Sequence, residues 1–289
     1  MKNPKSSLFS ERWLANQAFY GRDLLMHEPE NLMAKLHKQE RQFLSSFFWH
    51  YLRTDREEPI ESDLDEMLAF FSFAFLQRRR SHAQILQDLW ILYKTSEKHG
   101  GYFVEFGACD GHALSNTLLL EKGYGWTGLL AEPNPTWHAA LDANRTAAIS
   151  KKCVHHVTGE RIEFSCSTIP ELSRIADLVP NDIHERNGNR QEAERVEVET
   201  VTLHDLLLEV DAPNRIDYLS VDTEGSELEI LSAFDFSSFR FDFMTIEHSG
   251  EEKRRQELYD LLTGHGYQRW LPEVSLWDDW YIHEDALKA

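Results

Sequence analysis

The stretch YFVEFGACDG, residues 102–111, decides the fold. Its apolar, aromatic half leads into a turn with two glycines, which is typical of a buried strand that bends sharply into the next element. Three similar runs follow along the chain, at 127–131, 216–221 and 242–246. Stretches with helical patterns lie between several of these runs, at 113–121, 135–144 and 226–234. Near-continuous apolar strands that alternate with helices predict a mostly parallel sheet covered on both faces.

The chain before this region has a different character. Residues 1–81 show apolar residues at helical spacing and no strand pattern, so they predict an all-helical extension in front of an α/β domain at 82–289. The run MLAFFSFAFL at 67–76 is apolar on all sides, whereas a helix on a membrane surface keeps a polar side. The run therefore favours a helix buried against the domain or in a homodimer.

Three later stretches complete the outline. Segment 267–284 contains two short strand patterns with Pro272 near the turn, and it predicts a C-terminal hairpin. The polar, turn-rich stretch 180–195 predicts a mobile loop. Directly after it, valine and glutamate alternate over 196–199, as they do in a half-exposed strand.

Composition and charge narrow the classes of function. The chain has 30 Lys and Arg against 49 Asp and Glu, a formal net charge of −19. Nucleic-acid binding requires clustered cations, so the balance argues against a nucleic-acid partner and leaves uncharged, hydroxyl-bearing molecules suitable. The sequence contains neither a secretory signal nor a long uninterrupted apolar stretch, which predicts a cytoplasmic protein without a transmembrane segment. Its three cysteines lack metal-site spacing and are expected to be reduced thiols.

The end of the first strand carries an acid and two glycines. Ligands of such sheets bind beyond the carboxyl ends of the strands, where the strand order reverses. Glu105 lies in an apolar strand, where a carboxylate is costly unless it is paired or used. Gly107 and Gly111 allow the backbone to approach a ligand closely, although a simple strand-to-helix turn would also explain them. This spacing differs from the dinucleotide fingerprint and suits a cofactor without a pyrophosphate.

The second strand ends in Glu132, followed by Pro133, Asn134 and Pro135. An acid at this point can accept hydrogen bonds from both ribose hydroxyls of an adenosine. The alternative is an acid that only caps the helix expected at 135–144. Together with the glycine turn of the first strand, the pattern favours ribose binding.

Two further strand ends add a cluster of polar side chains. Asp222 and Glu224 follow one strand, and Glu247 and His248 end the next. Carboxylates gathered in this way suit a divalent cation or general-base chemistry. The alternatives are structural, with Glu224 as a first-turn acid of a helix and His248 as a capping histidine.

Several blocks of the sequence, in this order, resemble the FkbM-type methyltransferase family: 84–88 (QILQD), 104–116 (VEFGACDGHALSN), 125–135 (GWTGLLAEPNP), Asn144-Arg145 and 216–231 (IDYLSVDTEGSELEIL). Ile246-Glu247-His248 stands where that family tends to have a similar acidic triplet. The resemblance implies a class I methyltransferase (Rossmann-like) fold with a seven-stranded sheet that ends in an antiparallel hairpin. It also implies S-adenosylmethionine as methyl donor and an oxygen as acceptor, commonly a sugar hydroxyl of a glycan or a glycosylated metabolite. Glu105 stands where the family often has Asp, and residues 1–81 have no recognised counterpart.

The residues and the resemblance together give a set of expected roles. Residues expected to bind the cofactor are Glu105, Gly107, Ala108, Asp110, Gly111, Asn116, Glu132, Pro133, Asn134 and Asp222. Residues expected in catalysis are His248, as the leading proton acceptor, with Asp222 and Glu224. Residues that could hold Mg²⁺ are Asp222, Glu224 and Glu247.

Two other classes of function remain open. In a metal-dependent nucleotide-sugar glycosyltransferase, Asp222 and Glu224 would form an acidic metal motif, but the glycine turn after the first strand would then be unexplained. In a non-catalytic binding or scaffold protein, the fold would persist without chemistry. The helical extension at 1–81 suggests that association matters, and it predicts a homodimer formed by these helices.

Overall fold

The computed structural model describes residues 64–178, 183–272 and 275–288, and its centre is a seven-stranded mixed sheet of order β10-β11-β9-β8-β1-β2-β3. The parallel strands are β1 (Tyr102–Phe106), β2 (Thr127–Ala131), β3 (Ala148–Ser150), β8 (Arg215–Val221) and β9 (Arg240–Glu247). The antiparallel strands at the other edge are β10 (Tyr267–Trp270) and β11 (Asp278–His283). The mostly parallel sheet and its C-terminal hairpin were both expected from the sequence pattern.

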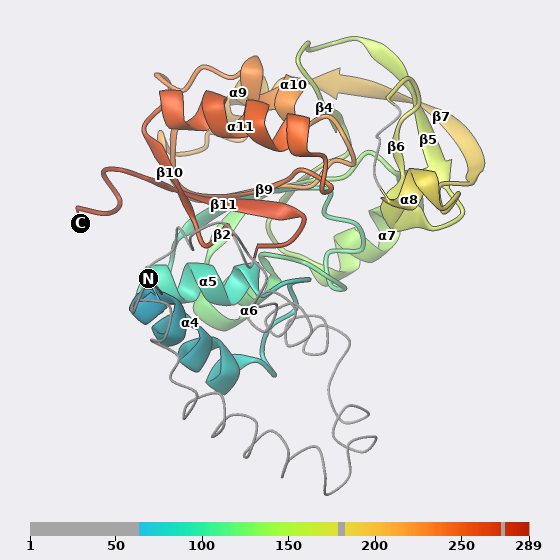
Figure 1. Ribbon diagram of the computed structural model, residues 1–289. Helices are drawn as coiled ribbons and strands as arrows, with labels where there is room; N and C mark the ends of the chain where they lie inside the picture. The colour runs from blue at the N-terminus through green and yellow to red at the C-terminus, as the bar shows by residue number, and fades with distance from the viewer. Residues whose placement is uncertain (1–63, 179–182, 273–274, 289) are drawn as a thin grey trace, which may run out of the picture.

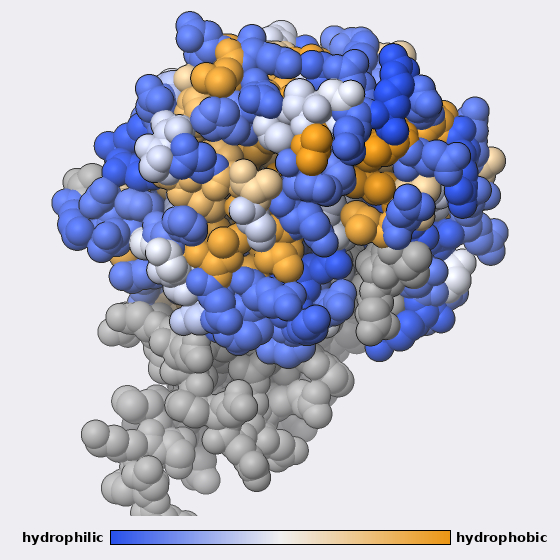
Figure 2. All heavy atoms as spheres, turned by 90° about the horizontal axis from the view of Figure 1, so that it is seen from above, coloured by the Kyte–Doolittle hydropathy of each residue, from blue (hydrophilic) through white to orange (hydrophobic). Residues whose placement is uncertain are grey.

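Helices cover both faces of this sheet (Figure 1). One face carries α4 (Leu64–Gln77), α5 (Gln87–Lys94) and α6 (Leu118–Tyr124). The other face carries α9 (Leu203–Glu209), α10 (Glu227–Ser232) and α11 (Glu252–Gly264). From the side of this second group, the surface is mostly hydrophilic and its apolar side chains form separate patches (Figure 2). A further helix, α7 (Pro135–Asn144), follows β2.

The helix expected from residue 113 begins only at Leu118. The preceding residues cannot join it because they are tied to the end of β1. The backbone N–H of Asn116 donates to Glu105 Oε1 at 2.7 Å, and the Ser115 hydroxyl also donates to this carboxylate. A side-chain acceptor from a distant strand therefore replaces the first helical turn.

Helix α4 is the apolar run at 67–76, and it packs against the domain. Met67, Phe70 and Ala74 are buried in one core cluster with residues of α5 and the hairpin. The Phe70 ring lies edge-on to Trp270, with 5.3 Å between the ring centroids. Full burial of such a side chain stabilises the fold by about 1.5–3 kcal/mol. One face of this run is therefore buried against the domain, as expected, whereas Phe75 and Leu76 are exposed.

Within the described ranges, the helices are too short or too polar to cross a membrane. Residues 1–63 lie outside the described residues. The helices expected there and a homodimer formed by these helices therefore stay predictions, and the domain boundary at 81/82 also stays a prediction.

A second sheet, of order β4-β7-β5-β6, stands beside the main one and was not expected (Figure 1). Its strands are β4 (Cys153–Val154), β5 (Arg161–Ser167), β6 (Arg174–Ile175) and β7 (Glu192–Val201). The short helices η1 (Pro170–Leu172) and α8 (Ile183–Arg186) lie in the same region. The expected loop at 180–195 thus contains a helical turn and the start of β7. The alternating valines do lie in a strand, because β7 pairs antiparallel with β5 and buries Val198 against Phe164.

Candidate functional site

Two neighbouring strands carry the same sequence of side chains along one face of the main sheet. From the core to the carboxyl edge each presents an aromatic ring, then a hydroxyl, then a carboxylate. These residues are Tyr218 and Ser220 on β8 with Asp222 directly after it, and Phe243, Thr245 and Glu247 on β9. Ser220 lies in register with Thr245. Because alternate residues of a strand share a face, this order buries the rings and brings the carboxylates together at the edge.

A cavity of about 440 Å³ opens at this carboxyl edge. Main-sheet residues that line it include Gly107 after β1, Glu132 after β2 and Glu247 on β9. The second sheet and the adjoining helix η1 contribute an apolar wall, formed by Val154, Phe164, Leu172 and Ile175. Small-molecule sites have this size and this mixture of apolar walls with few polar groups.

Gly107 makes the turn after β1 possible. Its φ is +74°, and a Cβ on this residue would lie 1.8 Å from the backbone oxygen of Asp222. The turn is held on its other side by the Gly107 N–H, which donates to the Ala131 carbonyl at 3.1 Å. The backbone at the ends of β1 and β8 therefore comes closer than any side chain would permit.

Glu105 organises the loop beside the cavity. Its side chain is 4% exposed, and its carboxylate faces the fully buried guanidinium of Arg145 at 3.4 Å. Arg145 also donates through Nε to Glu121 at 2.8 Å, so one buried cation balances two acids. Although Glu105 lines the cavity, hydrogen bonds from the chain already occupy both of its oxygens. Buried charges are stable only with such partners.

The Glu132 carboxylate can accept further hydrogen bonds from a ligand. Its Oε2 accepts from the Cys109 N–H at 2.9 Å and its Oε1 from the Asn134 N–H at 2.7 Å. Each carboxylate oxygen keeps a second lone pair. Burial raises the pKa of Glu132 to about 7. The side chain is thus fixed in place, lines the cavity and changes its charge near neutral pH.

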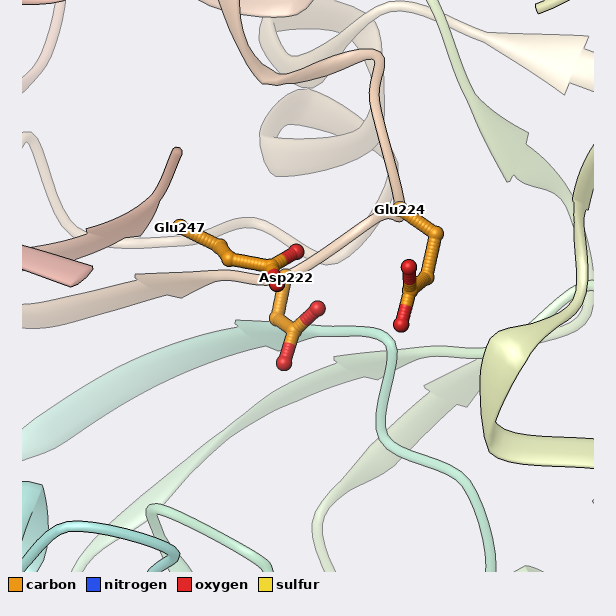
Figure 3. Close-up of side chains that lie close together, drawn as sticks. All are labelled: Asp222, Glu224 and Glu247. Atoms are coloured by element: carbon orange, nitrogen blue, oxygen red, sulfur yellow. The ribbon is translucent and has the colours of Figure 1, made fainter. Parts of the chain in front are cut away.

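The carboxyl groups of Asp222, Glu224 and Glu247 converge at the same edge, with potential ligand oxygens within 4.8 Å of one another (Figure 3). Burial raises the pKa of all three, and the charge of Asp222 adds to the shift at Glu224 and Glu247. Arg190 forms an ion pair with Glu224. The carboxyl groups of Asp222 and Glu247 are hydrogen-bonded to each other. These oxygens could bind a divalent cation or share a proton.

His248 is close in sequence but is not among the residues that line the cavity. It is 2% exposed, and its Nδ1 accepts from the Gly250 N–H at 3.1 Å. Burial lowers the pKa of His248 to about 4, so the imidazole is neutral at pH 7. Its role as a proton acceptor stays a prediction.

The structure brings most of the expected residues into one cavity. Those that line it are Glu105, Gly107, Ala108, Asn116, Glu132, Pro133, Asp222, Glu224 and Glu247. Three others are not among the residues that line it: Asp110, Gly111 and Asn134. The Asp110 carboxylate accepts from the His112 and Ala113 N–H groups, and Asn134 caps α7 and donates to Ser173.

Some lining residues carry no clear signal in the sequence. The apolar wall comes from the second sheet, whose strands are short and whose pairing is long-range. Gln84 and Trp277 also line the cavity. Gln84 belongs to the QILQD block, which carried part of the family resemblance but had no assigned role.

The sheet order, the glycine turn after β1 and the acid after β2 define a Rossmann-like α/β domain with a cavity at the carboxyl ends of the strands, where ligands of such sheets bind. Residues 105–269 match the methyltransferase FkbM domain family, and the chain belongs to it. No curated protein sequence matches the chain.

Solved structures with similarity to the chain include two methyltransferases. Methyltransferase FkbM from Methylobacillus flagellatus aligns at 13% identity with a TM-score of 0.40, over 76% of this chain and 59% of that one. Precorrin-6y C5,15-methyltransferase from Geobacter metallireducens aligns at 12% identity with a TM-score of 0.33, over 63% of this chain and 72% of that one. The chain therefore spans 59% of the length of the first of these structures.

Proposed function

We propose that the protein is an S-adenosylmethionine-dependent methyltransferase that methylates a hydroxyl oxygen, in particular a sugar hydroxyl of a glycan or glycosylated metabolite. One observation carries the proposal: the Gly107 turn and the Glu132 carboxylate open into the same cavity. Membership of the FkbM family supports the same activity.

The residues of the cavity fit the parts of this cofactor. Glu132 offers lone pairs to the ribose hydroxyls, and the wall with Phe164 and Leu172 offers an apolar seat for adenine. The backbone at Gly107 and Ala108 leaves room for the methionine portion beside Asp222. When bound, the cofactor supplies a methyl group activated by a positive sulfur.

The protein must align the acceptor and take up its proton. A hydroxyl is a poor nucleophile at neutral pH, so a base at the acceptor end is worth about 10²–10⁴ in rate. Asp222 and Glu247 line that end and hold a hydrogen bond between their carboxyl groups. We assign proton uptake to this pair, with Asp222 as the group nearest the glycine turn, because its backbone oxygen contacts Gly107. Holding the oxygen in line with the methyl group provides the rest of the acceleration.

Binding of the demethylated product, S-adenosylhomocysteine, should depend on pH through Glu132. Below its pKa of about 7 the side chain is protonated and can accept fewer hydrogen bonds, and above this pH it accepts from both ribose hydroxyls. We expect the affinity to rise about tenfold between pH 6 and pH 8, as the ionised fraction rises. Calorimetric titration at both pH values measures this change.

Glu132→Gln isolates this effect from other acids of the cavity. The variant should bind the product at least about tenfold more weakly at pH 8, since a hydrogen bond to a charged group is lost, and its affinity should not rise with pH. Glu197→Gln, at an exposed position of β7, should behave like the parent. Absence of product binding, or binding of a nucleoside diphosphate in its place, would refute the proposed function.

A second form of the proposal places Mg²⁺ between Asp222, Glu224 and Glu247, whose oxygens are the ligands that this ion prefers. The contacts of the chain favour the form without metal, because Arg190 already pairs with Glu224 and the other two acids are hydrogen-bonded to each other. We therefore expect exhaustive chelation to change methyl transfer by less than about twofold. A loss that added Mg²⁺ restores would establish the metal form.

A further inference from the structure

Trp277 lines the cavity together with the carboxylate residues Asp222 and Glu247. Trp277 directly precedes Asp278, which lies opposite Glu247 in the antiparallel pairing of β11 with β9. Its carbonyl accepts from the His248 N–H at 2.8 Å. The indole and the carboxylates therefore come from adjacent chain ends at the same edge of the sheet.

The QILQD block holds this indole in place. Trp277 donates through Nε1 to Gln84 Oε1 at 3.3 Å. Gln87 donates to the buried carboxylate of Asp278 at 2.8 Å, which ties the same block to the next residue of the hairpin. Asp88, the last residue of the block, accepts from the Ser81 hydroxyl at 2.6 Å and ties the block to the segment before it. This network gives the indole a fixed orientation toward the cavity.

Several other polar groups that line the cavity can accept hydrogen bonds from a ligand. They include the carboxyl groups of Asp222, Glu224 and Glu247. A separate observation points the same way: Asn116, only 7% exposed, lines the cavity, and its Oδ1 has no partner among the described residues. Glu247 Oε2 is likewise buried and has no hydrogen-bond partner among the described residues. Arg190 is already in an ion pair with Glu224.

We propose that the acceptor end of the cavity is a subsite for an amine-bearing sugar ring, with Trp277 as its platform and Asp222, Glu224 and Glu247 as partners of the ammonium group. The inference rests on the proposed methyltransferase function and specifies its acceptor. An aromatic face stacks on the apolar face of a sugar ring and attracts a cation. Carboxyl oxygens accept hydrogen bonds from an ammonium group, and in their ionised form they attract it and repel an anionic ring.

Three ring probes that differ in charge test the subsite: the methyl glycosides of glucosamine, glucose and glucuronic acid. Each is titrated into the full-length protein saturated with S-adenosylhomocysteine. We expect the amine probe to bind about tenfold more tightly than the neutral one, and the acidic probe to bind most weakly. Equal affinities, or tightest binding of the acidic probe, would overturn the proposal.

The same titrations separate this inference from the proposed function. If the product binds but none of the three probes does, the amine subsite is wrong and the cofactor pocket stands. If S-adenosylhomocysteine itself does not bind, the proposed methyltransferase function is wrong, and the amine subsite falls with it.

Variants of Trp277 test the platform directly. Trp277→Leu should weaken the amine probe about fivefold or more, whereas Trp277→Phe, which keeps a ring, should recover most of the affinity. Both should bind S-adenosylhomocysteine like the parent. Phe75→Leu, at an exposed aromatic position of α4, is the matched control and should change neither affinity. Unchanged binding of the amine probe by Trp277→Leu would remove the platform from the proposal.

Discussion

Gly107→Ala should abolish binding of S-adenosylhomocysteine and lower the stability of the fold. The added methyl group would lie 1.8 Å from the Asp222 carbonyl oxygen. The sheet holds the backbone of both residues in place, so neither can move away easily. Relief requires the ends of β1 and β8 to separate, which displaces Asp222 and the glycine turn together. Overpacking of this kind costs about 1–3 kcal/mol or more, and the positive φ adds about 1 kcal/mol. Thermal unfolding and calorimetry measure the two losses.

Gly125→Ala provides the matched control. Gly125 also has a positive φ, of +67°, but a Cβ there would meet no atom within 4 Å. This variant carries the cost of the strained backbone without the clash, so it should lose about 1 kcal/mol of stability and bind the product normally. If the two variants behaved alike, close contact between β1 and β8 would not be needed for the site.

The sequence predicted this turn but not the atom that requires it. An acid and two glycines after an apolar strand indicate close approach of the backbone. The partner, Asp222, lies more than a hundred residues later, and only the pairing of β1 with β8 brings it there. The strands themselves were easier to predict, because β1 and β2 are near-continuous apolar runs bounded by turn residues.

The second sheet illustrates what a local pattern cannot show. Its strands β4 and β6 have two residues each, and β7 begins in a stretch that is exposed and rich in charge. Such segments become strands only because β5 and β7 pair with each other. The apolar wall of the cavity was therefore missed, although Phe164 and Leu172 are ordinary core residues by composition.

The direction of the side chain decides which of the residues predicted at strand ends line the cavity. Asp222 and Glu247 follow the alternation that leads to the carboxyl edge on one face, and both line the cavity. His248 is the next residue along the chain, and neighbouring residues of an extended strand point to opposite sides. The sequence therefore predicted the correct edge of the sheet for His248, but the alternation of side chains directs its ring away from the cavity.

Asp222→Asn should slow methyl transfer by about 10²–10⁴, because an amide cannot take up the acceptor proton or share one with Glu247. The two side chains have nearly the same shape, so binding of S-adenosylhomocysteine should change by less than about fivefold. Release of labelled product from a labelled methyl donor, with a pool of glycan acceptors, measures the rate. Calorimetry on the same preparation measures the binding.

His248→Asn is the comparison variant that decides whether Asp222 or His248 takes up the acceptor proton. Asparagine can accept the Gly250 hydrogen bond that Nδ1 now accepts, so the loop after β9 should keep its conformation. Because the imidazole is not among the groups that line the cavity, we expect this variant to retain the parent rate within about tenfold. The opposite ranking, with the larger loss in His248→Asn, would assign proton uptake to the histidine. It would also require the side chain to turn toward the cavity when the acceptor binds, since a base must reach the hydroxyl whose proton it removes.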